Sequence, residues 1–355
     1  MDSKRLDSLL ASTTRLGASA LHLIPGRAPA LRVQRRFVEG DETVVQPEDI
    51  EELTRDMMFS DHREQLSRFG FVEVLYVSRG GDRYRATIAQ AHGLRTLVMR
   101  PVPAESPQLE QLELPEQIAG FARCRQGFVA VAGFFGSGKS TTLAAIVDAC
   151  NEDASRHIVS IEDSIEVVHD NGAALLHQRE VGTHVASAAE GVRQAVASGA
   201  DVIVVSEVHD EATLDAALGA AESGCLVFVG VEAGSIVGAL AEMTSLTAVE
   251  HRPRLRTRIA RSLRGITAQS LLHRSHKGGR VPVVEVAVGS PAVRTAIRGG
   301  RLQDLGGIMK RCRGLGMQTI DAALRGLLGR HLVTEEEALL HAGNREEVLA
   351  RLPGR

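Results

Sequence analysis

Five runs of apolar residues predict buried strands in the chain from residue 128 onward. They lie at residues 128–132, 157–161, 201–205, 225–231 and 281–288. Helical segments separate most of them: after the first run, apolar positions recur at i, i+3, i+4 and i+7, at Leu143, Ile146, Val147 and Cys150. Apolar strands that alternate with helices predict an α/β fold whose sheet is mainly parallel and covered by helices.

The first hundred residues have a different pattern, with shorter strands and two amphipathic helices. Strand signals fall at residues 21–23, 31–33, 69–77, 83–88 and 97–100. Three prolines then occur within residues 101–107, which disfavours a helix or a central strand there. We therefore predict an α/β domain over 1–100, a linker over 101–112 and a second domain over 113–355, whose last part, from about residue 290, is helical.

A glycine-rich loop joins the strand at 128–132 to the helix that contains Leu143. Strand, loop and helix in this order are the context of a phosphate-binding loop, because glycines let backbone N–H groups face phosphate oxygens. Lys139 would reach the β- and γ-phosphates of ATP, and the Ser140 hydroxyl would bind Mg²⁺. The predicted nucleotide-binding residues are Gly133, Gly136, Ser137, Gly138, Lys139, Ser140 and Thr141.

The amino-acid composition narrows the range of possible functions. The net charge is −3, the chain has no tryptophan and aromatic residues make up 3%, which disfavours a nucleic-acid partner. The four cysteines match no metal or redox spacing. No apolar stretch reaches 18 residues and no signal peptide is visible, so we expect a cytoplasmic protein without a transmembrane segment.

Two carboxylates follow predicted strands and are candidates for phosphoryl-transfer chemistry. Glu166 lies shortly after the strand at 157–161, and Glu207 comes two residues after the strand at 201–205. Parallel sheets bind ligands at the carboxyl ends of their strands, so both can lie near the phosphate-binding loop.

The chain resembles the type IV pilus and type II secretion ATPases, and most of all the pilus retraction (twitching motility) branch. The motifs that carry the resemblance are residues 17–23, the Walker A loop at 133–140, an Asp box at 161–169, the segment 178–182, Walker B at 201–207, and the C-terminal segments 290–300 and 314–319. The resemblance implies a PAS-like N-terminal domain, a RecA-like ATPase domain with C-terminal helices, and a homo-hexameric ring.

The resemblance also implies roles for four residues. Glu166 matches the catalytic carboxylate that activates water, and Glu207 matches the Walker B glutamate, a ligand of Mg²⁺ together with Ser140. Arg85 and Arg100 match two arginines that the family supplies to the nucleotide from the N-terminal domain. A solvated strand face is the alternative role for both arginines.

Several family positions differ here. Ala20, Ser164, Ala197 and His209 replace an aspartate, a proline and two arginines, and Phe134 and Phe135 replace Pro-Thr in the loop. The two histidines of the family's His box are replaced by Cys225 and Glu232. A histidine at these positions could donate a hydrogen bond toward the γ-phosphate or toward groups that move when it leaves, and Glu232 would place a negative charge near the nucleotide. We expect the two substitutions to slow turnover without weakening ATP binding.

These observations favour an ATP-hydrolysing motor subunit for pilus retraction, peripheral to the inner face of the inner membrane and bound to a pilus platform protein there. An accessory paralogue that binds ATP, assembles with a sister ATPase and hydrolyses slowly is the first alternative. A type II secretion or pilus-extension ATPase is the second, and a RecA-like nucleic-acid protein is the third.

Overall fold

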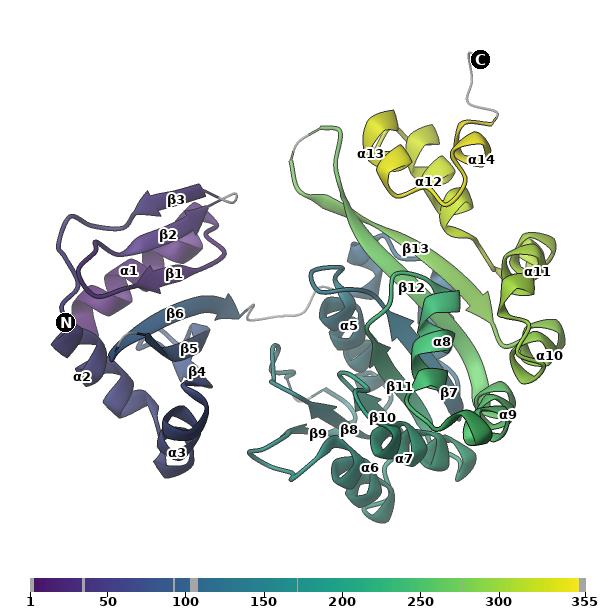
Figure 1. The fold of residues 1–355 in the computed structure, drawn as a ribbon, viewed down its shortest axis with the longest axis horizontal. Coiled ribbons are helices and arrows are strands. Elements are labelled where there is room, and N and C mark those ends of the chain that lie inside the picture. Colours follow the sequence, from purple (N-terminus) through teal and green to yellow (C-terminus); the bar gives the residue numbers. More distant parts are fainter. Residues whose placement is uncertain are drawn as a thin grey trace. The chain divides into compact units, whose positions relative to one another are not determined.

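Two separate β-sheets organise the chain, one in each of two compact units, Met1–Glu105 and Ser106–Arg355 (Figure 1). The computed structural model describes residues 3–33, 36–91, 93–102, 108–170, 172–276 and 278–350. Residues 103–107 of the predicted linker lie outside these ranges. Each unit is described by itself below.

The first unit is a six-stranded antiparallel sheet with helices packed on one face. Its elements are α1 (Ser3–Leu16), β1 (Leu21–Leu23), β2 (Ala30–Val33), β3 (Arg36–Glu39), α2 (Pro47–Met57), α3 (Ser60–Phe69), β4 (Phe71–Val77), β5 (Arg83–Ala91) and β6 (Leu94–Val102). The strand order is β3-β2-β1-β6-β5-β4. Leu6 and Leu10 of α1 and Ile50 of α2 are fully buried against strand residues such as Leu97 and Met99.

One sequence prediction fails at the end of this unit. Pro101 and Val102 belong to β6, a central strand of the sheet, although we expected the linker to begin at Pro101. The register explains why the proline is tolerated: β1 pairs with β6 only as far as Met99, whereas β5 continues to pair beyond it. Pro101 therefore has a strand neighbour on one side only, as an edge position does.

The second unit contains a seven-stranded sheet in the order β13-β12-β7-β11-β10-β8-β9. Its elements up to the last strand are η1 (Leu109–Leu112), α4 (Glu116–Ala122), β7 (Gly127–Ala132), α5 (Lys139–Asn151), β8 (His157–Glu162), β9 (Leu175–Glu180), α6 (Ala188–Ala197), β10 (Val202–Val205), α7 (Glu211–Glu222), β11 (Leu226–Val231), α8 (Ile236–Ser245), η2 (Val249–His251), α9 (Arg252–Ser262), β12 (Leu263–His273) and β13 (Arg280–Val288). All neighbours are parallel except β12 and β13. The predicted mainly parallel sheet is confirmed, but β9 and β12 were not predicted as strands.

Helices cover both faces of this sheet, and β7 shows how the sequence achieves it. Phe128, Ala130 and Ala132 point to the face covered by α6–α11, whereas Val129 and Val131 point to the face covered by α4 and α5. Side chains alternate along a strand, so a continuous apolar run fills both cores. Gly127 begins the strand with φ +124°, and a Cβ there would lie 2.9 Å from Ser262 O and closer still to Arg264.

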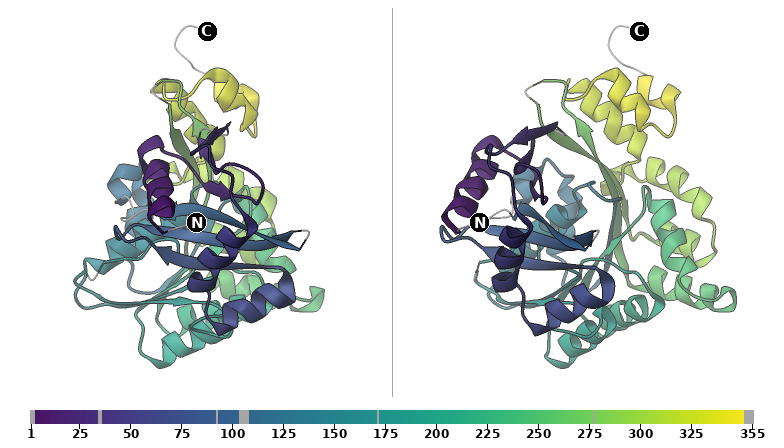
Figure 2. Two further views of the ribbon diagram at one scale, coloured as in Figure 1. Left: turned by 90° about the vertical axis from the view of Figure 1, so that its left-hand side faces the viewer. Right: turned by 60° about the vertical axis from the view of Figure 1, so that its left-hand side comes forward.

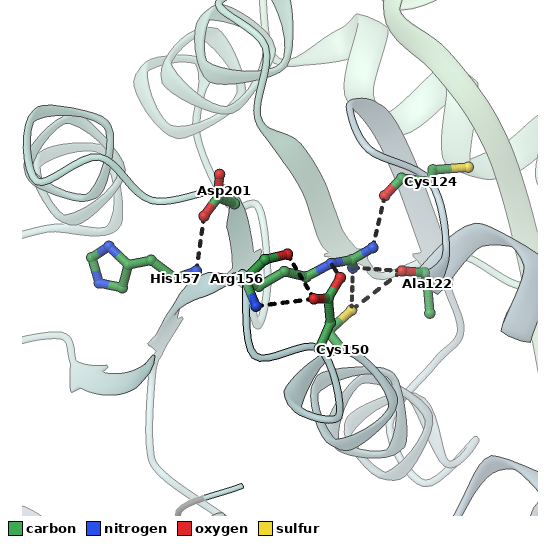
Figure 3. A network of polar contacts seen from close by, with 8 residues as sticks. Ala122, Cys124, Cys150, Arg156, His157 and Asp201 are labelled. Atoms are coloured by element: carbon green, nitrogen blue, oxygen red, sulfur yellow. Dashed lines mark hydrogen bonds and ion pairs between the residues drawn. The ribbon is translucent and has the colours of Figure 1, made fainter. Parts of the chain in front are cut away.

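Arg156 binds the ends of two helices at the amino-terminal edge of β8 (Figure 3). Its guanidinium donates to Ala122 O at 2.7 Å and to Cys124 O at 3.4 Å, next to the end of α4, and Nε donates to Asp153 at 3.1 Å. Cys150, near the end of α5, donates to the same Ala122 carbonyl. A cation thus satisfies carbonyls that a helix end leaves without partners.

The chain ends in helices, as predicted. They are α10 (Pro291–Arg298), η3 (Leu302–Asp304), α11 (Leu305–Arg311), η4 (Arg313–Leu315), α12 (Ile320–Gly329), α13 (Glu335–Leu340) and α14 (Arg345–Leu349). The last three pack on the far end of the long β12–β13 hairpin, drawn in yellow beside green strands (Figures 1 and 2).

Candidate functional site

The loop between β7 and α5 has backbone geometry that requires glycine. Gly136 and Gly138 have φ of +79° and +87°, in the left-handed region that other residues rarely adopt. A Cβ at Gly133 would lie 2.1 Å from the Ser137 hydroxyl oxygen. The loop leads directly into α5, whose first turn is not capped by a side chain, so its N–H groups can bind an anion.

Lys139 and Glu207 meet at this loop. Lys139 Nζ donates to Glu207 Oε1 at 2.6 Å, and the two side chains are 10% and 20% exposed. Glu207 follows β10, and one strand, β11, separates β10 from β7. The structure therefore brings together the predicted phosphate-binding lysine and the predicted Mg²⁺ ligand, which are 68 residues apart in sequence.

A glycine on β11 lets Glu207 approach. A Cβ at Gly230 would lie 1.9 Å from Ser206 O, and Val208 N donates to Gly230 O at 3.0 Å. The turn that carries Glu207 thus crosses directly over the backbone of the neighbouring strand.

Gln269 of β12 is a site residue that the sequence did not suggest. Its side chain is 2% exposed, donates to Ser137 O at 3.0 Å and accepts from Thr142 Oγ1 at 3.0 Å. One amide thus fixes the loop to the first turn of α5. The signal in the sequence that could have identified Gln269 was a polar residue within a buried strand.

A cavity of about 240 Å³ adjoins the loop. Leu112, Leu114, Leu271 and Pro282 form apolar walls, and Thr141 and Thr142 of α5 lie at one side. Arg274 and Arg280 also line it, and Arg274 forms an ion pair with Glu113. An apolar slot beside a phosphate-binding loop has the chemistry to accept a nucleobase.

Ser140 and Thr141 lie exposed in the first turn of α5, and Glu207 is adjacent to the same loop. A hydroxyl and a carboxylate are the hard oxygen donors that Mg²⁺ prefers, so the residues fit this ion bound together with phosphates. Among the described residues no cluster of three or more histidine, cysteine, aspartate or glutamate side chains could hold a metal without such a partner.

Glu166 lies exposed in the loop between β8 and β9. The start of that loop is attached to the turn after β10: Asp163 N donates to Ser206 Oγ at 3.0 Å, and His209 Nε2 lies 3.3 Å from Asp163 Oδ2. His209 therefore links the two acidic segments.

Arg85 and Arg100, in the first unit, are directly opposite each other on β5 and β6. Like charges at opposed positions destabilise a sheet unless an anion compensates them. Glu73 of β4 lies 3.7 Å from Arg100, and Thr87 links the two side chains, because it donates to Glu73 at 2.7 Å and accepts from Arg100 at 3.4 Å. The two predicted arginines, Glu73 and Thr87 thus lie together on one face of the sheet.

The two altered His-box positions lie at opposite ends of β11. Cys225 precedes the amino end of the strand, is 7% exposed and donates to Ala200 O at 3.2 Å. Burial raises the pKa of its thiol. Glu232 follows the carboxyl end, beside the end of β7 and the loop, and is exposed. Only position 232 can act on a nucleotide bound at this loop.

Comparison with known proteins agrees with this arrangement. A family model described as "Type II/IV secretion system protein" matches residues 85–303. The chain is 32% identical to the type IV pilus retractation ATPase PilT of Pseudomonas aeruginosa over 94% of its length and 96% of that protein.

This chain belongs to the type II/IV secretion system protein family.

Two further comparisons place the chain among the pilus ATPases of this secretion system family. It is 30% identical to the type IV pilus ATPase PilU of Pseudomonas aeruginosa, over 96% of this chain and 90% of that protein. The crystal structure of the pilus retraction motor PilT with bound ADP superposes with a TM-score of 0.87 and 32% identity, covering 96% of this chain and 97% of that one. The expected fold, an N-terminal α/β domain followed by a RecA-like ATPase domain, is confirmed. No helix in the described ranges is long and apolar enough to span a membrane.

Proposed function

We propose that this chain is an ATP-hydrolysing motor subunit that drives retraction of a type IV pilus. The observation that carries the proposal is the contact between Lys139 and Glu207 at a glycine loop that opens onto the end of the sheet. A phosphate entering that loop competes with Glu207 for the lysine, which frees the carboxylate to bind a metal ion. Phosphate binding and metal binding are then coupled through one ion pair.

Each predicted site residue has a separate role in ATP binding or hydrolysis. The loop from Gly133 to Thr141 holds the phosphates of ATP, with Ser140 and Glu207 on Mg²⁺, which supplies positive charge to the phosphate oxygens when bound. Glu166 accepts a proton from the attacking water.

The rest of the motor is assembled in a ring. Arg85 and Arg100 act on a nucleotide within a homo-hexamer. There the two arginines add to the positive charge of Lys139 and Mg²⁺ and stabilise negative charge on the γ-phosphate. The ring works in the cytoplasm at the inner face of the inner membrane, and passes force to a platform protein of the pilus there. The named activity of PilT and the near-complete coverage of both chains support this assignment.

A second candidate is an accessory subunit that binds ATP but hydrolyses it slowly, alone or in a ring with a sister ATPase. Glu232 favours it, because an ionised carboxylate beside the loop repels phosphate and can only accept hydrogen bonds. The fold and the P-loop are the same in both candidates.

Two measurements on the purified chain in the presence of ATP and Mg²⁺ separate the candidates. One is the steady-state rate of phosphate release, and the other is the molecular mass of the assembly, which gives its oligomeric state. A motor should release phosphate as an oligomer, and Glu207→Gln should lower that rate by ~10²-fold or more while the oligomer persists. Tight nucleotide binding with negligible release supports the accessory candidate. Absence of nucleotide binding contradicts both.

A further inference from the structure

The loop that carries Glu166 has no regular secondary structure in its described part, yet its backbone is held at alternate residues. Ile165 N donates to Glu180 Oε2 at 3.1 Å, and His169 N donates to Gln178 Oε1 at 2.9 Å. Between them, Val167 O accepts from Gln178 Nε2 at 2.8 Å. Glu166 therefore lies between backbone groups that are bound by two side chains of β9.

Gln178 is the centre of this arrangement because its amide makes three hydrogen bonds. Besides Val167 O, its Nε2 also donates to Glu162 Oε1 at 3.0 Å. The orientation of the amide is determined by the backbone, since a carbonyl can only accept and an N–H can only donate. No other residue type of this length offers donors and an acceptor in this geometry.

The partners of Gln178 are themselves held in place. Glu162, at the end of β8, also accepts from Ser160 Oγ at 2.7 Å, and burial raises the pKa of its carboxyl group. His169 Nδ1 lies 2.5 Å from Asp148 Oδ1 of α5. The loop is thus attached to two parallel strands on one side and to the helix of the phosphate-binding loop on the other.

We propose that Gln178 is a positioning residue for hydrolysis, which holds the loop 163–170 on β9 so that Glu166 is presented in one geometry. This inference rests on the role proposed above for Glu166. A loop without secondary structure samples many conformations, and fixing it beforehand removes that entropic cost from the chemical step. Strands are better supports for such a group than loops are.

A purely structural role for Gln178 makes a different prediction. Substitution of Gln178 would then lower the stability of the protein and leave the turnover of the folded protein unchanged. Positioning should instead lower kcat and leave KM and ADP affinity nearly unchanged, because Gln178 has no hydrogen bond to the phosphate-binding loop.

The test compares Gln178→Glu and Gln178→Met with the control Gln194→Glu, a glutamine on the exposed surface of α6 that binds Glu190. Gln178→Glu keeps the shape but replaces the donors with a carboxylate that faces Val167 O and Glu162, and Gln178→Met removes all three bonds without adding charge. We expect kcat to fall about 10- to 100-fold in both variants, with the ADP dissociation constant changed less than about threefold. Lowering the pH should restore part of the activity of Gln178→Glu alone, because a protonated carboxyl again offers a donor.

Amide hydrogen exchange provides the second readout. The His169 amide, which donates to Gln178 Oε1, should exchange at least tenfold faster in Gln178→Met and at an unchanged rate in Gln194→Glu. Unchanged exchange together with unchanged kcat overturns the positioning role while leaving the proposed function intact. If the unaltered chain releases no phosphate, the proposed function fails, and exchange alone then decides whether Gln178 orders this loop.

Discussion

At the scale of single residues, the site depends on side chains whose charges are matched within the fold. Lys139 is one of only four lysines in a chain with 41 lysines and arginines, and it is placed where a slim point charge fits between a glycine loop and Glu207. That both residues lie at one end of the sheet was predictable, because each follows a strand of a parallel sheet, but their direct contact was not predicted. The role of Gln269 was not, because it depends on a strand that contributes no other recognisable motif.

Lys139→Ala should lower ATP affinity at least tenfold, since it removes a charge-assisted contact of ~1.5–3 kcal/mol. Titration calorimetry with ATP measures the change. Lys310→Ala is the matched control, because it also removes a lysine that pairs with a glutamate, Glu347, but on the C-terminal helices. Equal affinities in the two variants would contradict the phosphate-binding assignment.

Glu232→His should raise turnover by up to ~10²-fold, because a hydrogen-bond donor would replace a repelling carboxylate near the phosphate. ATP affinity should rise by less than turnover does, since the loop and Glu207 are untouched. Phosphate release under saturating ATP is the measurement, with Glu242→His, on the exposed surface of α8, as the control. If the unaltered chain already turns over as fast as the variant, the accessory candidate loses its main support.

At the scale of elements, the sequence predicted what is encoded locally. The strand β7, the loop and α5 follow from an apolar run, three glycines and helical spacing within a short stretch. By contrast, β9 is an edge strand with the sequence His177-Gln-Arg-Glu180 at its end, and polar edge strands lack the apolar pattern of a buried strand. β12 carries Thr267 and Gln269 at buried positions, which obscured it in the same way.

Arg156 makes a prediction at this scale because it connects α4, α5 and β8. Arg156→Ala should destabilise the second unit by about 2–3 kcal/mol, since the side chain is only 13% exposed and its loss removes one donor each from Ala122 O, Cys124 O and Asp153. Arg193→Ala, which removes an exposed ion pair with Glu190, should leave the unfolding temperature nearly unchanged. Thermal unfolding followed by far-ultraviolet circular dichroism measures both.

The two tyrosines provide an internal check on that experiment. Tyr76 and Tyr84 both lie in the first unit, and the chain has no tryptophan. Tyrosine fluorescence therefore reports the first unit, and its transition should not move in Arg156→Ala. A shift of both signals would mean that Arg156 does not act locally.

At the scale of the whole molecule, the sequence predicted two α/β units and the mainly parallel sheet of the second. It did not predict that Arg85 and Arg100 would be cross-strand partners, since register depends on the turn and on pairing beyond each strand. Their juxtaposition places two positive charges side by side on one sheet face, with Glu73 next to Arg100.

Arg100→Ala should lower phosphate release at least ~10²-fold if the arginine acts on nucleotide within the ring. The tyrosine fluorescence of the first unit should unfold at nearly the same temperature, because Arg100 is about half exposed. Arg55→Ala, at an exposed position of α2 in the same unit, is the control. Normal turnover in a variant of confirmed oligomeric mass would contradict the role.

The construction of β7 limits how genes for such proteins can diverge. The strand has six residues, all buried, which begin at Gly127 and are followed by Gly133, and a Cβ on either glycine would collide with neighbouring atoms. Deleting or inserting one residue would exchange the valines of one core with the phenylalanine and alanines of the other. Substitutions that preserve side-chain volume can accumulate in this strand, whereas a change in its length should prevent the second unit from folding. Alignments of functional homologues should therefore contain no gap between these two glycines, even where the surrounding loops vary freely in length.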